Sequence, residues 1–354
     1  MSGYPERNTS PYELFLELAR RNVPRHRFDG GDATAWQAAA KPAVLATLGE
    51  LPSPVDPRPE LIAEWEEGGL VRQRWLIDVQ EGLSAVAYVH RPAALAPGER
   101  RPGILCWPGH GGFGKEPVMG NGSSPELRAA IAKQGSNYGE RMAQAGFVTF
   151  AIDWMGQGDL DDRRKPHHRD IASGRDLCDV FYLHATMLGM TSLGLNVRHG
   201  SALVDFVSTL PFVDADHLGV MGESYGGTLA LWNALVDDRL RAVEIICYSD
   251  VFADFGYRDT NYCGSQVAPG LFNLVDVPDL QGLLMPRPLL VDIGVYDEGF
   301  RAESALACYR RLQEIYAAAG AEKQLELELA PSDHGWHAGR KSVAFFSTHL
   351  GGQW

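Results

Sequence analysis

From residue 70 onward, short apolar runs rich in Val, Ile, Leu and Phe alternate with longer stretches of helical periodicity. The apolar runs predict strands, at residues 103–107, 147–152, 218–221, 242–247, 288–293 and 324–330. The intervening stretches predict helices, near residues 126–145, 196–209, 226–236, 301–319 and 336–349. Strands that alternate with helices form a mostly parallel sheet with helices on both faces, so we expect an α/β fold.

Two further runs, 70–79 and 84–91, have the alternating pattern of strands and are joined through a short turn at 80–82. This pattern predicts a β-hairpin, which would form an antiparallel edge of the sheet. Together with the six apolar runs, it brings the expected sheet to about eight strands.

Residues 1–68 have a helical character that differs from the rest of the chain. Ser10, Pro11 and Glu13 form a capping-box pattern that predicts a first helix. A second helical run covers residues 33–48 and is expected to break at Pro42, and a third covers 61–65. We therefore expect an N-terminal helical extension or cap (1–68) followed by a catalytic domain (69–354).

Two connections, 155–196 and 250–285, are too long to be simple crossovers. Long irregular connections inside a compact domain are typical of lids and binding loops. Both are rich in aromatic residues, which either anchor the loops to the core or line a pocket: Phe181, Tyr182, Phe252, Phe255, Tyr257, Tyr262 and Phe272.

Composition and charge narrow the class of protein. The net charge of −13 disfavours a nucleic-acid partner, because phosphates would be repelled. The N-terminus lacks the pattern of a signal peptide and no run of about 18 apolar residues occurs, so we expect a cytoplasmic protein without membrane insertion. The five cysteines form no CxxC pair, which favours free thiols, and we expect neither a metal site nor a cofactor. The sequence leaves open whether the chain forms a homo-oligomer.

The segment Gly222-Glu223-Ser224-Tyr225-Gly226 matches G-x-S-x-G between a predicted strand and a predicted helix. In this context the motif is a nucleophile elbow, a sharp turn that raises the serine hydroxyl above the sheet. Ser224 is therefore the expected nucleophile.

A serine needs a base to take its proton, and that base needs an acid to orient it. The chain order Ser, then Asp or Glu, then His predicts His334, which follows the last strand, as the base. His337, three residues later, is the alternative and is expected to begin the last helix. Asp297 follows the strand at 288–293 and is the expected acid, with Asp250 as its rival.

The loop after the strand at 103–107 reads Pro108-Gly-His110-Gly111-Gly112-Phe-Gly114, a pattern that predicts an oxyanion loop. We expect the backbone N–H groups of Tyr225 and of Gly111 or Gly112 to stabilise the oxyanion, with His110 bracing the loop. The same residues also match G-x-G-x-x-G and, up to Lys115, G-x-x-x-x-G-K. We reject a phosphate site because the following residues are expected to form a loop rather than the required helix.

On these segments the chain resembles the α/β-hydrolases grouped with dienelactone hydrolases and acetyl xylan esterases, from about residue 35 to 349. The resemblance rests on residues 107–116, 213–227, 285–290 and 297–300. It implies an α/β-hydrolase fold, a Ser224–Asp297–His334 triad and hydrolysis of carboxylic esters. The chain departs from dienelactone hydrolases in having Ser rather than Cys as the nucleophile.

The sequence therefore predicts a serine hydrolase that cleaves small-molecule esters of small to medium organic acids through an acyl-enzyme. Three alternatives remain open. The same triad could serve a C–C bond hydrolase or a peptidase or amidase, although no β-propeller domain accompanies it. A ligand-binding homologue without catalysis would be expected to lose at least one triad residue, and all three are present.

Overall fold

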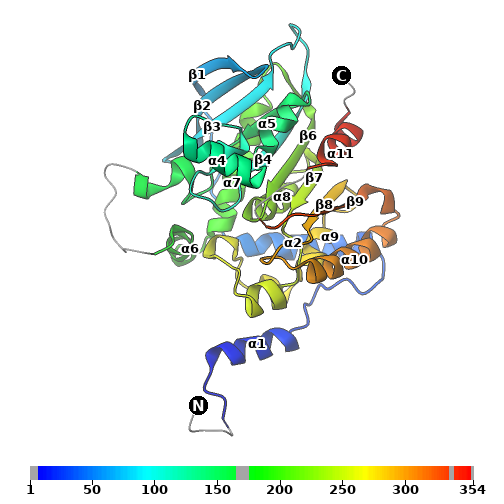
Figure 1. The fold of residues 1–354 in the computed structure, drawn as a ribbon. Helices are drawn as coiled ribbons and strands as arrows, with labels where there is room; N and C mark the ends of the chain where they lie inside the picture. The colour runs from blue at the N-terminus through cyan, green and yellow to red at the C-terminus, as the bar shows by residue number, and fades with distance from the viewer. Residues whose placement is uncertain (1–6, 165–174, 335–338, 352–354) are drawn as a thin grey trace.

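The computed structural model describes residues 7–164, 175–334 and 339–351, and it is organised around one twisted sheet (Figure 1). The strand order is β1-β2-β3-β5-β4-β6-β7-β8-β9. The strands are β1 (Glu60–Glu67), β2 (Leu70–Gln80), β3 (Leu83–Pro92), β4 (Arg101–Trp107), β5 (Val148–Ala151), β6 (Val213–Glu223), β7 (Leu240–Ile246), β8 (Leu289–Gly294) and β9 (Leu325–Ala330).

The first three strands pair antiparallel, β3 pairs antiparallel with β5, and every later pair is parallel. The α/β expectation and the antiparallel hairpin at the edge are confirmed. The sheet has nine strands where the sequence predicted about eight. In the parallel part, all strands end at the same edge, so the loops that follow them meet there.

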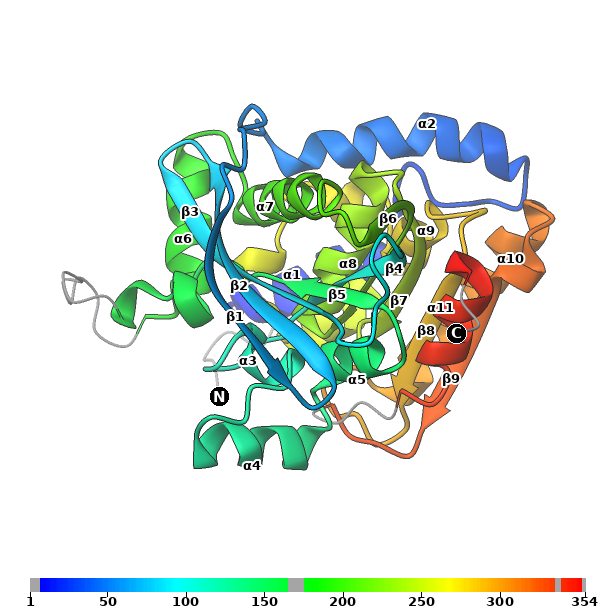
Figure 2. The same cartoon turned by 90° about the horizontal axis from the view of Figure 1, so that it is seen from above.

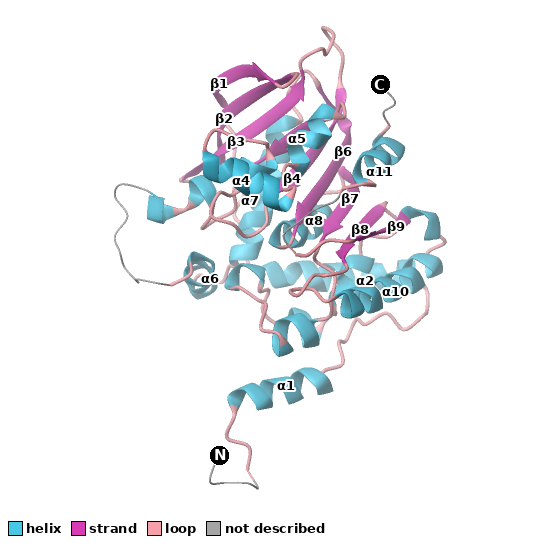
Figure 3. Ribbon diagram, viewed as in Figure 1, coloured by secondary structure: helices cyan, strands magenta, loops and turns pink. Residues whose placement is uncertain are grey.

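Helices cover both faces of the sheet, as Figures 2 and 3 show. Two apolar cores result, one of which packs beneath α2, α7, α8, α9 and α10, and the other beneath α3, α5 and α11. The helices are α1 (Pro11–Arg21), α2 (Ala33–Leu45), α3 (Lys115–Val118), α4 (Pro125–Gln134), α5 (Tyr138–Gln144), α6 (Leu177–Met187), α7 (Ser192–Val207), α8 (Tyr225–Val236), α9 (Val277–Gly282), α10 (Ala302–Ala318) and α11 (Ser342–Leu350).

The helical prediction for residues 61–65 is wrong, because this segment lies in strand β1. Almost every residue of β1 is exposed, so no alternation of buried and exposed positions marks it as a strand. Its conformation is set by the ladder with β2, including a register shift between Leu61 and Ala63. Pairing with a distant partner overrides local propensity in such an edge strand.

The two other N-terminal helices form as the sequence predicts. The Ser10 hydroxyl caps α1 by accepting from the Glu13 amide at 3.2 Å, and Pro11 occupies the first turn. The predicted break at Pro42 does not occur, since α2 runs through it to Leu45 and continues as a 3₁₀ turn. Pro42 removes one helical hydrogen bond, but the helix is held by burial of residues such as Ala40 and Val44.

The two long connections carry local structure of their own. Residues 155–196 hold α6 and the start of α7, and residues 250–285 hold a π-helical turn (Phe252–Arg258), short 3₁₀ turns and α9. The last helix begins at Ser342, later than predicted, and His337 lies outside the described residues. No helix among the described residues is long and apolar enough to cross a membrane.

Candidate active site

Ser224 lies at the tip of the turn between β6 and α8. Its backbone has φ 55° and ψ −118°, a left-handed conformation that is strained for a residue with a side chain. Its amide donates to the Ile246 carbonyl at 2.8 Å, which ties the turn to the neighbouring strand β7. The strand–turn–helix context that the motif requires is therefore present.

The glycines of the motif are there because the backbone passes too closely for a side chain. A Cβ on Gly222 would lie 2.2 Å from the Gly226 carbonyl oxygen. A Cβ on Gly226 would lie 2.3 Å from the carbonyl oxygen of Trp107 at the end of β4. The first contact tightens the Ser224 turn itself, and the second places the turn directly against the end of β4 and the loop that follows it.

The structure brings Ser224, His334 and Asp297 together from the ends of β6, β9 and β8. His334 Nε2 lies 2.9 Å from Ser224 Oγ, and its Nδ1 lies 2.9 Å from Asp297 Oδ2. The other carboxylate oxygen of Asp297 accepts from the amides of Gly299 at 2.7 Å and Phe300 at 2.8 Å. The carboxylate is thus fixed by two backbone donors, and the imidazole bridges it to the hydroxyl.

The environment of His334 makes its imidazole more basic than an ordinary histidine. Its side chain is 37% exposed, whereas that of Asp297 is 1% exposed. Burial lowers the pKa of His334, but the hydrogen bond and charge of Asp297, with further carboxylates nearby, outweigh burial and raise the pKa above its ordinary value. The Phe300 ring stacks on the imidazole with centroids 5.5 Å apart, a contact that the sequence did not indicate.

The rival acid, Asp250, is placed elsewhere. It follows β7, is fully buried, and accepts from the Val251 amide at 2.7 Å, while its second oxygen has no hydrogen-bond partner within the described part of the chain. Burial raises its pKa to about 7. His334 Nδ1 donates its hydrogen bond to Asp297, not to Asp250.

The loop predicted to supply oxyanion donors lies directly against the Ser224 turn. A Cβ on Gly109 would lie 2.8 Å from the Glu223 carbonyl oxygen and 3.4 Å from Ser224 Cβ. Gly111 and Gly112 face open space, so backbone there is accessible. Tyr225 is the first residue of α8, where amides have no partner within the helix and the dipole favours negative charge.

The buried cation of Lys115 anchors this loop, a role that the sequence did not indicate. The Lys115 ammonium, which is fully buried, donates to Asp153 and to Asp159, both at 2.7 Å, and the Lys115 amide also donates to Asp153. Burial lowers the pKa of Lys115, but the two carboxylates raise it above its ordinary value, so the group stays charged. Residues 115–118 form a single helical turn, α3, rather than the predicted loop. The ammonium is nevertheless already paired with two carboxylates, so it is not available to bind a phosphate.

Ser224 and His334 open into a small pocket of about 150 Å³. Its described walls come from the loop after β4, from α3 and α4, and from Glu223. They are mostly glycine, proline and small apolar side chains, and none of the described lining residues is Lys or Arg.

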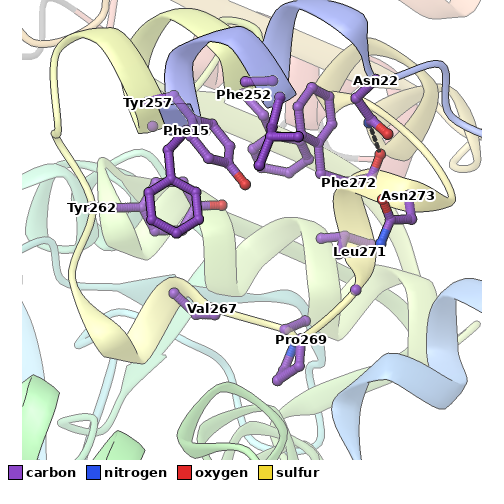
Figure 4. A pocket seen from close by; sticks show the side chains of 15 residues that line it. Phe15, Asn22, Phe252, Tyr257, Tyr262, Val267, Pro269, Leu271, Phe272 and Asn273 are labelled. Carbon is purple, nitrogen blue, oxygen red and sulfur yellow. Dashed lines mark hydrogen bonds between the residues drawn. The ribbon is translucent and has the colours of Figure 1, made fainter. Parts of the chain in front are cut away.

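A larger pocket of about 570 Å³ lies apart from Ser224, between α1 and the 250–285 connection (Figure 4). Four of the aromatic residues predicted as anchors or pocket walls line it, namely Phe252, Tyr257, Tyr262 and Phe272. Helix α1 supplies the opposite wall and is held by a hydrogen bond from Asn22 to the Phe272 carbonyl at 2.6 Å. Among the described residues, α1 therefore lines this pocket and not the one at Ser224.

Comparison with known proteins agrees with this architecture. The model of the Abhydrolase family matches residues 13–314. YtaP of Bacillus subtilis strain 168, named as a hydrolase, is 24% identical over 303 residues, covering 84% of this chain and 94% of that protein.

Among solved structures, one from Bacteroides fragilis named as an acetyl xylan esterase superposes with a TM-score of 0.74 at 18% identity, covering 92% of this chain and 83% of the other. Glucuronoyl esterase from Solibacter usitatus superposes with a TM-score of 0.65 at 16% identity, covering 90% and 94%. At such identities the likeness shows the fold, and the α/β-hydrolase fold expected from the sequence is confirmed. The chain belongs to the Abhydrolase family.

Proposed function

We propose that this chain is a serine esterase that hydrolyses carboxylic esters of short acyl groups through an acyl-enzyme on Ser224. The observation that carries the proposal is the continuous hydrogen-bonded chain from Asp297 through His334 to Ser224 Oγ, with both links at 2.9 Å. A serine hydroxyl is a weak nucleophile unless a base within hydrogen-bond reach takes its proton.

In the first half-reaction His334 Nε2 takes the hydroxyl proton while Ser224 Oγ bonds to the ester carbonyl carbon. The charge that develops on the carbonyl oxygen is stabilised by the N–H of Tyr225 and that of Gly111 or Gly112. The intermediate collapses, the alcohol–carbon bond breaks, and His334 gives its proton to the leaving alcohol. Water then attacks the acyl-enzyme in the same way and releases the acid.

The pocket supports a short and uncharged acyl group. A volume of about 150 Å³ leaves little room beyond a few carbon atoms, and its described lining offers no cation to a second carboxylate. Glu223 adds a negative charge near the nucleophile, which disfavours anionic acyl groups.

The names of the similar proteins agree with an ester substrate, since they include acetyl xylan, glucuronoyl and methyl esterases. At 15–18% identity, the polymeric or sugar substrates of those proteins cannot be assigned to this chain. We therefore propose the bond type and leave the alcohol to experiment.

The proposal is tested with p-nitrophenyl esters of increasing acyl length and with a fluorophosphonate probe. Wild type should hydrolyse acetate and propionate esters fastest, and mass mapping should place the probe on Ser224. Ser224→Ala should lose both activities. Ser136→Ala is the matched control and should keep both activities, because Ser136 lines the same pocket but its hydroxyl has no hydrogen-bond partner among the described residues, and so no base.

Other results would favour the alternatives. Probe labelling of Ser224 without ester turnover, combined with cleavage of a β-diketone, would favour a C–C bond hydrolase, and cleavage of anilides would favour an amidase. If neither labelling nor turnover of any of these substrates occurs, the chain is a binding homologue and the proposal is wrong.

A further inference from the structure

Three metal-binding side chains converge beside the proposed oxyanion loop. His110 Nε2 lies 3.2 Å from the sulfur of Cys263 and 3.7 Å from that of Cys178. All three atoms lie within 4.8 Å of one another. Cys178 and Cys263 lie 68 and 153 positions after His110 in the chain, so no CxxC motif predicts this cluster.

The segments that carry these side chains are held in place by other contacts. Cys178 lies in the first turn of α6, and Asp179 in the same turn accepts from the Gly264 amide at 2.9 Å. This bond fixes α6 against the residue that follows Cys263. The two segments that carry the sulfur atoms are therefore held together by a contact that needs no bound ion.

The imidazole of His110 is held by aromatic rings. Trp154 and Tyr225, both fully buried, lie with ring centroids 5.0 Å and 5.3 Å from it. The Tyr225 hydroxyl donates to the Ser265 carbonyl at 2.9 Å and accepts from Asn196 at 3.0 Å, which fixes that ring. The histidine thus presents Nε2 to the sulfur atoms from a preorganised position.

The spacing matches that of a tetrahedral zinc site. With Zn–S near 2.3 Å and Zn–N near 2.0–2.1 Å, tetrahedral angles place a nitrogen about 3.6 Å from each sulfur and the sulfurs about 3.8 Å apart. The two observed N–S distances bracket the first value. Two sulfurs and an imidazole form a soft ligand set that suits Zn²⁺ rather than Mg²⁺ or Ca²⁺.

We propose that His110, Cys178 and Cys263 form a binding site for Zn²⁺, with a fourth position open to water or another small ligand. His110 is exposed and also lines the pocket of Ser224, so the fourth position has access to solvent. A bound ion would join three segments, namely the loop after β4, α6 and the 250–285 connection. The site is independent of the proposed esterase chemistry, which uses none of the three side chains as acid, base or nucleophile.

The test uses full-length protein that has been reduced and freed of metal by a chelator, and then titrated with Co²⁺ as a spectroscopic probe. One equivalent should produce thiolate-to-cobalt charge-transfer absorption and the intense visible bands of a tetrahedral site. Zn²⁺ should displace the cobalt, and the melting temperature should rise with the concentration of free Zn²⁺ because the ion binds the folded state.

Cys263→Ser should weaken Co²⁺ binding by about 100-fold or more, since loss of even an outer-shell partner costs about 10–100-fold. The serine can still cap the 3₁₀ turn that Cys263 now caps, so the variant should fold. His110→Gln is a second variant with the same expectation. Cys308→Ser is the matched control, because Cys308 is buried in α10 away from the cluster, and it should bind as wild type does.

Absence of the charge-transfer band in reduced wild type would overturn the proposal. So would equal Co²⁺ affinity in Cys263→Ser and Cys308→Ser. A third refuting result concerns the disulfide between Cys178 and Cys263, which lowers the intact mass by two hydrogens. If this disulfide forms equally fast with and without one equivalent of Zn²⁺, the ion does not bind the two sulfurs.

Discussion

Replacement of Asp297 by Asn tests the geometry around His334 most directly. In the wild type, one carboxylate oxygen accepts from the amides of Gly299 and Phe300, and the other accepts from His334 Nδ1. An amide side chain has one acceptor oxygen and one donor NH₂ group, so it cannot serve both sides as the carboxylate does. The amide must therefore choose an orientation.

The two backbone donors decide that orientation. If the NH₂ group faced them, the buried amide of Phe300 and the part-buried amide of Gly299 would lose their acceptor, at about 1–3 kcal/mol each. The oxygen should therefore keep the backbone side, and the NH₂ group should face His334 Nδ1. The imidazole must then carry its proton on Nε2, which is the atom that has to accept the proton of Ser224.

The working tautomer would thus be disfavoured by about 2–6 kcal/mol. At about 1.4 kcal/mol per factor of ten, kcat should fall by roughly 30-fold to 2 × 10⁴-fold, a range that includes the loss of about 10⁴ known for the same change in serine proteases. KM for a p-nitrophenyl ester should change little, because the Asp297 side chain is 1% exposed and does not reach the pocket. The assay is steady-state hydrolysis, with the rate of fluorophosphonate labelling as an independent readout.

The pH profile of the same variant provides a second check. The raised pKa of His334 means that wild-type activity should increase with pH through a value above the ordinary histidine pKa, as the imidazole becomes neutral. Asp297→Asn removes the charge that raises the pKa and leaves the burial that lowers it, so the acid limb should move to lower pH. A variant within tenfold of wild-type kcat and with an unmoved acid limb would refute the assignment of Asp297.

Three further changes probe parts of the fold that support the site. Lys115→Met leaves the Asp153 carboxylate buried without its cation and should cost about 3–5 kcal/mol in urea unfolding; a loss under 1 kcal/mol would contradict a structural role for the pair. Asp250→Asn should leave kcat unchanged. Burial raises the folded-state pKa of this carboxyl from 3.8 to about 7, so the wild type should lose stability as the pH rises between those values, and the variant should not. If the melting temperatures of wild type and variant change equally between about pH 5 and pH 8, Asp250 ionises freely and this reasoning is wrong. Gly226→Ala places a methyl group 2.3 Å from the Trp107 carbonyl oxygen and should abolish labelling of Ser224 with a loss of about 1–3 kcal/mol, whereas normal labelling would show that the turn can relax.

The sequence determined the local parts of this protein. The strand–turn–helix around Ser224 could be predicted because its glycines and its apolar flanks are adjacent in the chain. The order of Ser224, Asp297 and His334 could be predicted because each follows a strand of a parallel sheet, and such strands end at one edge. The triad roles remain predictions, although the three side chains lie within hydrogen-bond distance.

Only the tertiary structure decided the features that depend on distant partners. Strand β1 carries no apolar pattern of its own and is a strand because β2 supplies its hydrogen bonds. Lys115 matched a phosphate-loop pattern in the sequence, yet its ammonium pairs with carboxylates 38 and 44 residues away. The cluster of His110, Cys178 and Cys263 likewise arises from three separate segments. Local propensity and motif spacing act over a few residues, whereas pairing, burial and charge neutralisation act between segments that meet only once the chain has folded.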